Sequence, residues 1–140
     1  MKKLALICLP VMLAACSQSG QPKPGEVAVY DGIGESETVT LLGTEPFWNM
    51  QVEHGMLTYS TPENMAGSHA AVTRFAGNGG IGYSGTLDGQ DLHIAVTPGD
   101  CSDGMSERTY PFVATITLGK TMLTGCGYTS EHDFKGEEHP

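Results

Sequence analysis

Polar and aromatic side chains suited to ligand binding occur in two stretches that are far apart in the chain. Five of them carry the candidate binding chemistry: Glu45, Trp48, Asp103, Arg108 and Tyr110. If the two stretches meet at one end of a β fold, the Arg108 guanidinium and the Trp48 indole form a binding mouth for a carboxylate or a sugar. The alternative is structural: Trp48 plugs the end of the fold, and Arg108 pairs with Glu45 or Asp103 to lock a loop.

The cysteines predict one disulfide. Of the four cysteines, Cys8 falls within the expected leader and Cys16 at its end, which leaves Cys101 and Cys126. An even pair in an exported chain predicts a bridge, and closing a loop of this length contributes about 3.5 kcal/mol in the chain-entropy model. The alternative is two reactive or metal-binding thiols, although their spacing matches neither a Cys-x-x-Cys redox pair nor a zinc ligand pair.

Catalytic chemistry is not favoured. A hydrolase needs a nucleophile within reach of an oriented base, and the chain has no Gly-x-Ser-x-Gly elbow. Four of the five histidines have predicted places that suit solvent exposure: His54 falls in a turn, His93 on an outward strand face, and His132 and His139 near the C-terminus. Glu45 and Asp103 are conceivable as a glycosidase pair, but nothing favours them in that role. The acidic and histidine residues after residue 130 predict at most weak binding of a divalent ion, so we predict no enzyme, no cofactor and no metal site.

Residues 1–15 have the pattern of an export signal. Two lysines precede a short apolar run that ends in small residues. The run is too short to cross a bilayer as a helix, which takes about 20 residues. The alternative to a lipoprotein signal is a plain secretory signal followed by a fortuitous cysteine.

The sequence Leu13-Ala14-Ala15-Cys16 resembles the lipobox of bacterial lipoproteins. The resemblance implies cleavage before Cys16, a diacylglyceryl group on its thiol and a fatty acid such as palmitate on its amine. Three acyl chains give a firm membrane anchor. Ser17 at the next position implies sorting to the outer membrane, facing the periplasm.

The charge of the chain limits its partners. The formal net charge of −9 becomes −11 once Lys2 and Lys3 leave with the signal. An acidic surface repels phosphate backbones, so we predict no nucleic-acid binding. The same surface attracts a basic protein, and a small-molecule ligand is the other partner class. The alternative is that the charge only keeps the domain soluble. The sequence does not indicate an oligomeric state.

Short alternating segments predict an all-β domain, a small antiparallel β-barrel or sandwich of seven or eight strands with one disulfide. Asp88-Gly89 is the strongest hairpin signal. Residues 61–68 are predicted as a loop, and Asp103 or Ser106 is predicted to cap a single helical turn. The predicted strands are Val39–Leu42, Trp48–Glu53, Met56–Ser60, Ala70–Phe75, Ile81–Leu87, Leu92–Val96, Phe112–Leu118 and Met122–Tyr128.

The predicted organisation is linear. Residues 1–15 form the signal, 16–36 the lipidated cysteine and a flexible tether, 37–129 the barrel, and 130–140 a frayed acidic tail.

Two motifs resemble those of a family of bacterial envelope lipoproteins that is itself distantly similar to META/HslJ-like β domains. The motifs are Gly-Thr-Glu-Pro-Phe-Trp at residues 43–48 and Cys-x-Asp-Gly-Met-Ser-Glu-Arg-x-Tyr-Pro at residues 101–111. The resemblance spans roughly Leu41 to Tyr128 and carries over no catalytic residue. Together these features predict a non-catalytic periplasmic binding or envelope-stress module. The alternative is an inhibitor of a basic peptidoglycan-degrading enzyme, similar to lysozyme inhibitors.

Overall fold

The structure is a computed structural model that describes residues 24–25 and 28–137. The predicted export signal, Cys16 and much of the predicted tether lie outside the described residues, as do Glu138 and His139. No helical segment of the described part has the length and apolar character that crossing a bilayer requires.

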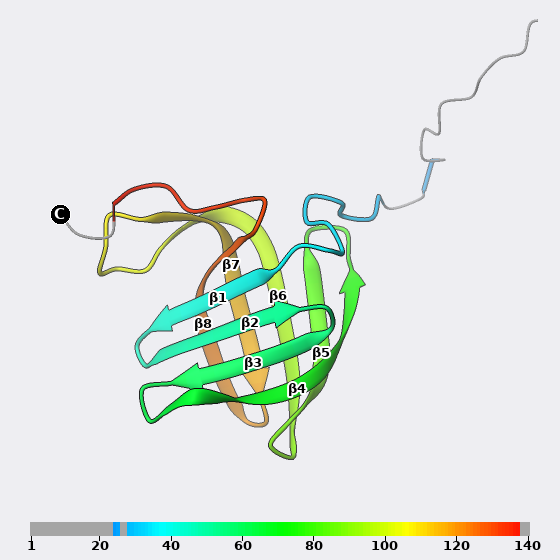
Figure 1. Ribbon diagram of the computed structural model, residues 1–140. Coiled ribbons are helices and arrows are strands. Elements are labelled where there is room, and N and C mark those ends of the chain that lie inside the picture. The colour runs from blue at the N-terminus through cyan, green and yellow to red at the C-terminus, as the bar shows by residue number, and fades with distance from the viewer. Residues whose placement is uncertain (1–23, 26–27, 138–140) are drawn as a thin grey trace, which may run out of the picture.

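Eight antiparallel strands close into a barrel (Figure 1), which confirms the predicted all-β fold. Each strand pairs with its neighbour in sequence, and β1 pairs with β8 to complete the ring. Closure removes the unpaired edges that short strands would otherwise expose. The strands are β1 (Val39–Thr44), β2 (Phe47–Glu53), β3 (Met56–Thr61), β4 (Asn64–Ala76), β5 (Ile81–Leu87), β6 (Gln90–Ser102), β7 (Thr109–Leu118) and β8 (Thr121–Thr129).

Alternating side chains fill the interior of the barrel. In β2, Trp48, Met50 and Val52 are buried, whereas the residues between them are exposed. The same alternation in β6 buries Leu92 and Ile94. Because eight strands enclose a space just wide enough for side chains, these residues form one continuous core inside the ring.

Two strands exceed their predicted lengths the most. β4 and β6 span 13 residues each, so residues 64–69 continue β4 and residues 97–102 continue β6. The register of β6 against β7 shifts between Pro98 and Cys101. Proline has no N–H to donate, so a bulge at this position accommodates it and bends the strand. The end of β6 and the start of β7 therefore project from the barrel as a hairpin (Figure 1).

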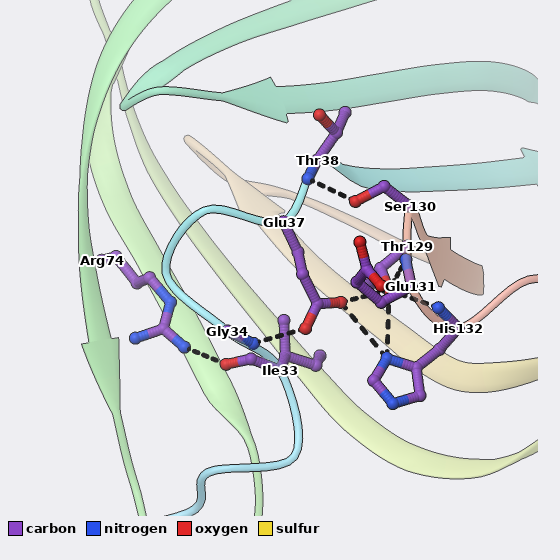
Figure 2. A network of polar contacts seen from close by, with 9 residues as sticks. All are labelled: Ile33, Gly34, Glu37, Thr38, Arg74, Thr129, Ser130, Glu131 and His132. Carbon is purple, nitrogen blue, oxygen red and sulfur yellow. Dashed lines mark hydrogen bonds and ion pairs between the residues drawn. The ribbon is translucent and has the colours of Figure 1, made fainter.

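Residues 30–38, which we call the strap, pack against one end of the barrel. Ile33 is 1% exposed and belongs to the core. Its carbonyl accepts a hydrogen bond of 2.7 Å from Nη2 of Arg74 on β4 (Figure 2), and the N–H of Tyr30 donates to the carbonyl of Gly77 at 2.7 Å. The sequence pattern predicts a flexible tether up to residue 36. The strap differs from this prediction because Ile33, a single apolar side chain that closes a barrel end, leaves no periodic pattern in the sequence.

Glu37 fastens the strap to the segment that follows β8 (Figure 2). Its Oε1 accepts a hydrogen bond from the N–H of Gly34 at 2.6 Å, and its Oε2 accepts one from the hydroxyl of Thr129 and lies 3.2 Å from Nδ1 of His132. Burial acts to raise the pKa of Glu37, but the hydrogen bonds from Thr129, Gly34 and His132 outweigh it and the pKa is lowered. An ionised Glu37 therefore holds the strap and the segment that follows β8 together.

The residues after β8 also lie against the barrel. Lys135 exchanges two backbone hydrogen bonds of 2.8 and 2.9 Å with Thr109 at the start of β7. The N–H of Thr129 donates to the carbonyl of His132 at 2.9 Å. The sequence pattern predicts a frayed acidic tail from residue 130, because charged residues give no sign of backbone pairing with a distant strand. Up to residue 137, the structure instead describes this segment as part of the domain.

The indole of Trp48 lies across the space that two glycines leave inside the barrel. A Cβ added at Gly43 would lie 2.1 Å from Nε1 of Trp48, and one added at Gly125 would lie 2.9 Å from its Cζ2. Both distances are shorter than real carbon contacts allow. Strands β1 and β8 can therefore flank the indole only because they carry glycine at these positions.

We predict that Gly43→Ala lowers the free energy of unfolding by about 1–3 kcal/mol, because the added methyl group must displace the indole or the backbone. Urea denaturation followed by circular dichroism measures the change. Gly79→Ala is the matched control, since a Cβ there meets nothing within 4 Å. Equal stability of the two variants would contradict the packing of Trp48 over Gly43.

Candidate functional site

Residues 99–110, which we call the hairpin tip, fold back onto the outside of the barrel. The predicted disulfide is confirmed: Cys101 in the tip is bonded to Cys126 on β8, with their Cα atoms 5.5 Å apart. The hydroxyl of Thr44, the last residue of β1, donates a hydrogen bond of 2.9 Å to the carbonyl of Asp103. Since β1 and β8 are neighbours in the sheet, these two links hold the tip across the closing strand pair.

The carboxylate of Asp103 organises the turn of the hairpin tip. Its Oδ1 accepts hydrogen bonds from the N–H groups of Met105 (2.9 Å) and Ser106 (2.8 Å), and its Oδ2 accepts them from the hydroxyls of Ser106 (2.7 Å) and Tyr110 (3.1 Å). Burial acts to raise the pKa of Asp103, but these hydrogen bonds outweigh it and lower the pKa to about 2. The N–H contacts are those predicted for a helix cap. No helix follows, however, and Gly104 at φ 74° closes a tight turn instead.

Arg108 lies on an aromatic cluster beside the tip. Its Cζ is 4.1 Å from the ring centroid of Phe134, and a partly buried contact of this kind contributes about 1 kcal/mol. Phe134 also packs against Tyr128 and Tyr110, with centroid distances of 5.2 and 5.5 Å. Burial raises the pKa of Tyr110; the neighbouring Arg108 acts to lower it and Asp103 to raise it. The cluster therefore packs the tip, β8 and the C-terminal segment against one another.

A groove of about 670 Å³, which we call the tip groove, lies between the hairpin tip and strands β1–β3. Asp103, Arg108 and Tyr110 line its tip side. Phe47 and Met65 line the barrel side and are 52% and 84% exposed. Apolar side chains with a few fixed polar groups are typical of a binding site.

A second hollow, of about 600 Å³, adjoins the tip groove. Glu45 and Met105 lie at this hollow, and Met105 is 67% exposed. Thr44 and Asp103 line both spaces. The two hollows are therefore adjacent parts of one recessed surface, with the Asp103 turn between them.

The tip groove is lined by four of the five residues predicted for binding: Trp48, Asp103, Arg108 and Tyr110. The fifth, Glu45, lies in the adjoining hollow. Trp48 is only 4% exposed and belongs to the barrel core, as the structural alternative predicts. Arg108 lies over Phe134, a contact that the sequence does not indicate.

Three residues of the site were missed by sequence reasoning. Phe47 precedes the buried Trp48, so the alternation of β2 already indicates that it faces outward. Met65 falls in a segment predicted as a loop and carries no periodic signal. Phe134 is the one large hydrophobic residue after residue 130, which is a signal that it packs on the barrel.

The comparisons with known proteins and the search for metal ligands add no assignment. No protein-family model, curated protein or solved structure matches this chain. Among the described residues, no group of three histidine, cysteine, aspartate or glutamate side chains is placed to hold a metal ion. His132, from the predicted weak metal cluster, lies against Glu37.

We predict that Asp103→Asn lowers the free energy of unfolding by about 1–3 kcal/mol at neutral pH, because the amide nitrogen cannot accept the hydroxyl hydrogen bonds. The pKa of Asp103 is lowered from 3.8 to about 2. Its ionised form therefore stabilises the fold above about pH 4, and this contribution is lost as the pH falls toward 2.

Denaturation of wild type and variant across this pH range measures the effect, and the gap between them narrows with acid. Asp100→Asn, at an exposed position next to Cys101, is the matched control and leaves stability unchanged. A gap that stays constant down to pH 2 would show that the Asp103 carboxylate is not the stabilising group.

Proposed function

We propose that this chain is a lipid-anchored, non-catalytic binding module of the bacterial outer membrane, faces the periplasm, and binds its ligand in the tip groove. One observation carries the proposal. The tip wall of the groove is fixed by a disulfide and by the Asp103 hydrogen bonds, yet Phe47 and Met65 on the barrel wall remain exposed. A surface held rigid while it exposes apolar side chains loses little entropy when a partner binds.

The anchor rests on the sequence. The lipobox-like Leu-Ala-Ala-Cys ending at Cys16 and the resemblance to envelope lipoproteins both support export and acylation. The disulfide is consistent with an oxidising compartment. A module tethered to the inner leaflet of the outer membrane would present its groove to the periplasm.

The polar groups of the tip groove support binding rather than catalysis. A general acid or base works best with a pKa near the operating pH, whereas the pKa of Asp103 is about 2. Arg108 is stacked on Phe134. No histidine is among the residues that line the groove. These groups can orient a ligand, but none is poised to transfer a proton.

The charge around the tip groove favours a basic partner. Glu45, Glu63 and Glu107 are exposed on the turns that surround it, beside the ionised Asp103. Arg108, the one lysine or arginine among the residues that line the groove, is half-buried. Carboxylates of this kind speed the encounter with a basic protein. This observation supports the second candidate function, inhibition of a basic peptidoglycan-degrading enzyme such as a c-type lysozyme.

We predict that Met65→Lys weakens partner binding roughly tenfold, because it replaces an apolar contact and adds repulsion toward a basic partner. The full-length chain is cross-linked in intact envelopes, and the cross-linked species are quantified by mass spectrometry. Met122→Lys is the matched control, since Met122 is 68% exposed and lies outside the groove.

The identity of the cross-linked species separates the two candidate functions. A basic lytic enzyme, together with slower clearing in a lysozyme turbidity assay, favours the inhibitor. A different protein partner favours the general binding module. Equal cross-linking by the two methionine variants would remove the tip groove from either function.

We also predict that the mature chain begins at Cys16 with a diacylglyceryl thioether and an acylated amine. Mass spectrometry of the N-terminal peptide from purified outer membranes measures both groups. Cys16→Ser is the informative variant, because it removes the acylated thiol without touching the barrel. A native N-terminus that lacks acyl chains would overturn the anchor.

A further inference from the structure

A separate cavity of about 290 Å³, which we call the strap cavity, lies beside the strap at the other end of β1 from the tip groove. Arg74 of β4 and Tyr83 of β5 supply its polar wall. Val52 and Val72 supply its apolar wall. The strap itself contributes two carboxylates, Glu35 and Glu37, so the cavity carries opposite charges on two sides.

Arg74 is a half-buried cation, and none of the described residues supplies a carboxylate partner for it. Its Nη2 donates to the carbonyl of Ile33, and its guanidinium hydrogen-bonds the hydroxyl of Tyr83. Its Nε is buried and has no acceptor among the described residues, and no carboxylate in that part of the chain forms an ion pair with it. A partly desolvated guanidinium gains from a nearby negative charge, so this wall of the cavity favours an anionic group.

The opposite side of the cavity favours a cation. Glu35 is exposed at the cavity. Glu37 is kept ionised by the hydrogen bonds that it accepts from Gly34 and Thr129, and its Oε2 also lies 3.2 Å from Nδ1 of His132, outside the cavity lining. A simple anion would meet repulsion from these two carboxylates, and a simple cation would meet repulsion from Arg74. His54, the remaining titratable side chain at the cavity, is exposed on the turn between β2 and β3. A ligand with both charges satisfies both sides.

The size of the cavity narrows the ligand class. Its volume of about 290 Å³ is at the bottom of the range for small-molecule sites, about 300–1,000 Å³. The short apolar wall formed by Val52 and Val72 suits a small aliphatic group. We propose that the strap cavity binds a free amino acid zwitterion, with its carboxylate on Arg74 and Tyr83 and its ammonium group toward Glu35 and Glu37.

The test uses isothermal titration calorimetry on the full-length chain in detergent micelles, with alanine as the probe. Acetate and methylammonium each carry one half of the recognised charge pattern. We expect alanine to bind at millimolar concentration and each half ligand to bind roughly tenfold more weakly, since each half ligand forms only one of the two charged contacts.

Two variants locate the binding. Tyr83→Phe removes one hydroxyl and Glu35→Gln removes one exposed charge, and each should weaken alanine binding roughly tenfold. The matched controls are Tyr59→Phe, at a half-buried tyrosine of β3, and Glu53→Gln, on the outward face of β2; neither residue lines the cavity.

Three results would overturn the proposal. They are no heat of binding with alanine, acetate binding as tightly as alanine, and variants that bind as tightly as their controls. Because the Glu35 position is exposed, its variant tests the site even if Tyr83→Phe does not fold. None of the four positions lines the tip groove, so the result is independent of the proposed function.

Discussion

The pairing of β1 with β8 is the constraint on which the rest of the structure depends. This seam joins only four residue pairs, from Val39–Thr129 to Leu42–Cys126, whereas β1 pairs with β2 at six positions. So short a seam needs further stabilisation, and three links lie beside it. Glu37 ties the strap to Thr129, the disulfide ties the hairpin tip to β8, and Thr44 bonds the tip to β1. Each link joins segments distant in sequence, so together they close the ring where strand pairing is weakest.

The same links create the surface on which the proposed function rests. Because the tip is fastened across the seam, one wall of the tip groove is fixed by covalent and hydrogen bonds rather than by the packing of a mobile loop. The Asp103 turn and the Phe134 cluster then orient the polar side chains. Binding sites carried on loops depend on such support from a rigid scaffold. Here the device that stabilises closure also shapes the groove.

Sequence reasoning predicted the barrel and the disulfide because both follow from local or countable features. Alternation in β2 and the Asp88-Gly89 turn specify strands and hairpins directly, and the pairing of Cys101 with Cys126 followed from elimination. The meeting of the two motifs entered only as a condition, and the sequence left open whether Trp48 faces a ligand or the core. The strap, the ordered segment around Phe134 and the long ends of β4 and β6 were missed. Their positions are set by contacts with distant strands, which leave no periodic pattern in the chain.

The placement of the strap has a mechanical consequence under the proposed membrane anchor. Tension applied from the N-terminal side reaches Tyr30 first, then Ile33, and only then the latch at Glu37. These bonds bear the tension one after another and not together, so each breaks at low force. By contrast, β1 is hydrogen-bonded along both edges and resists extraction from the sheet. The strap would therefore detach and lengthen first under load. The tip, at the far end of β1, would keep its shape.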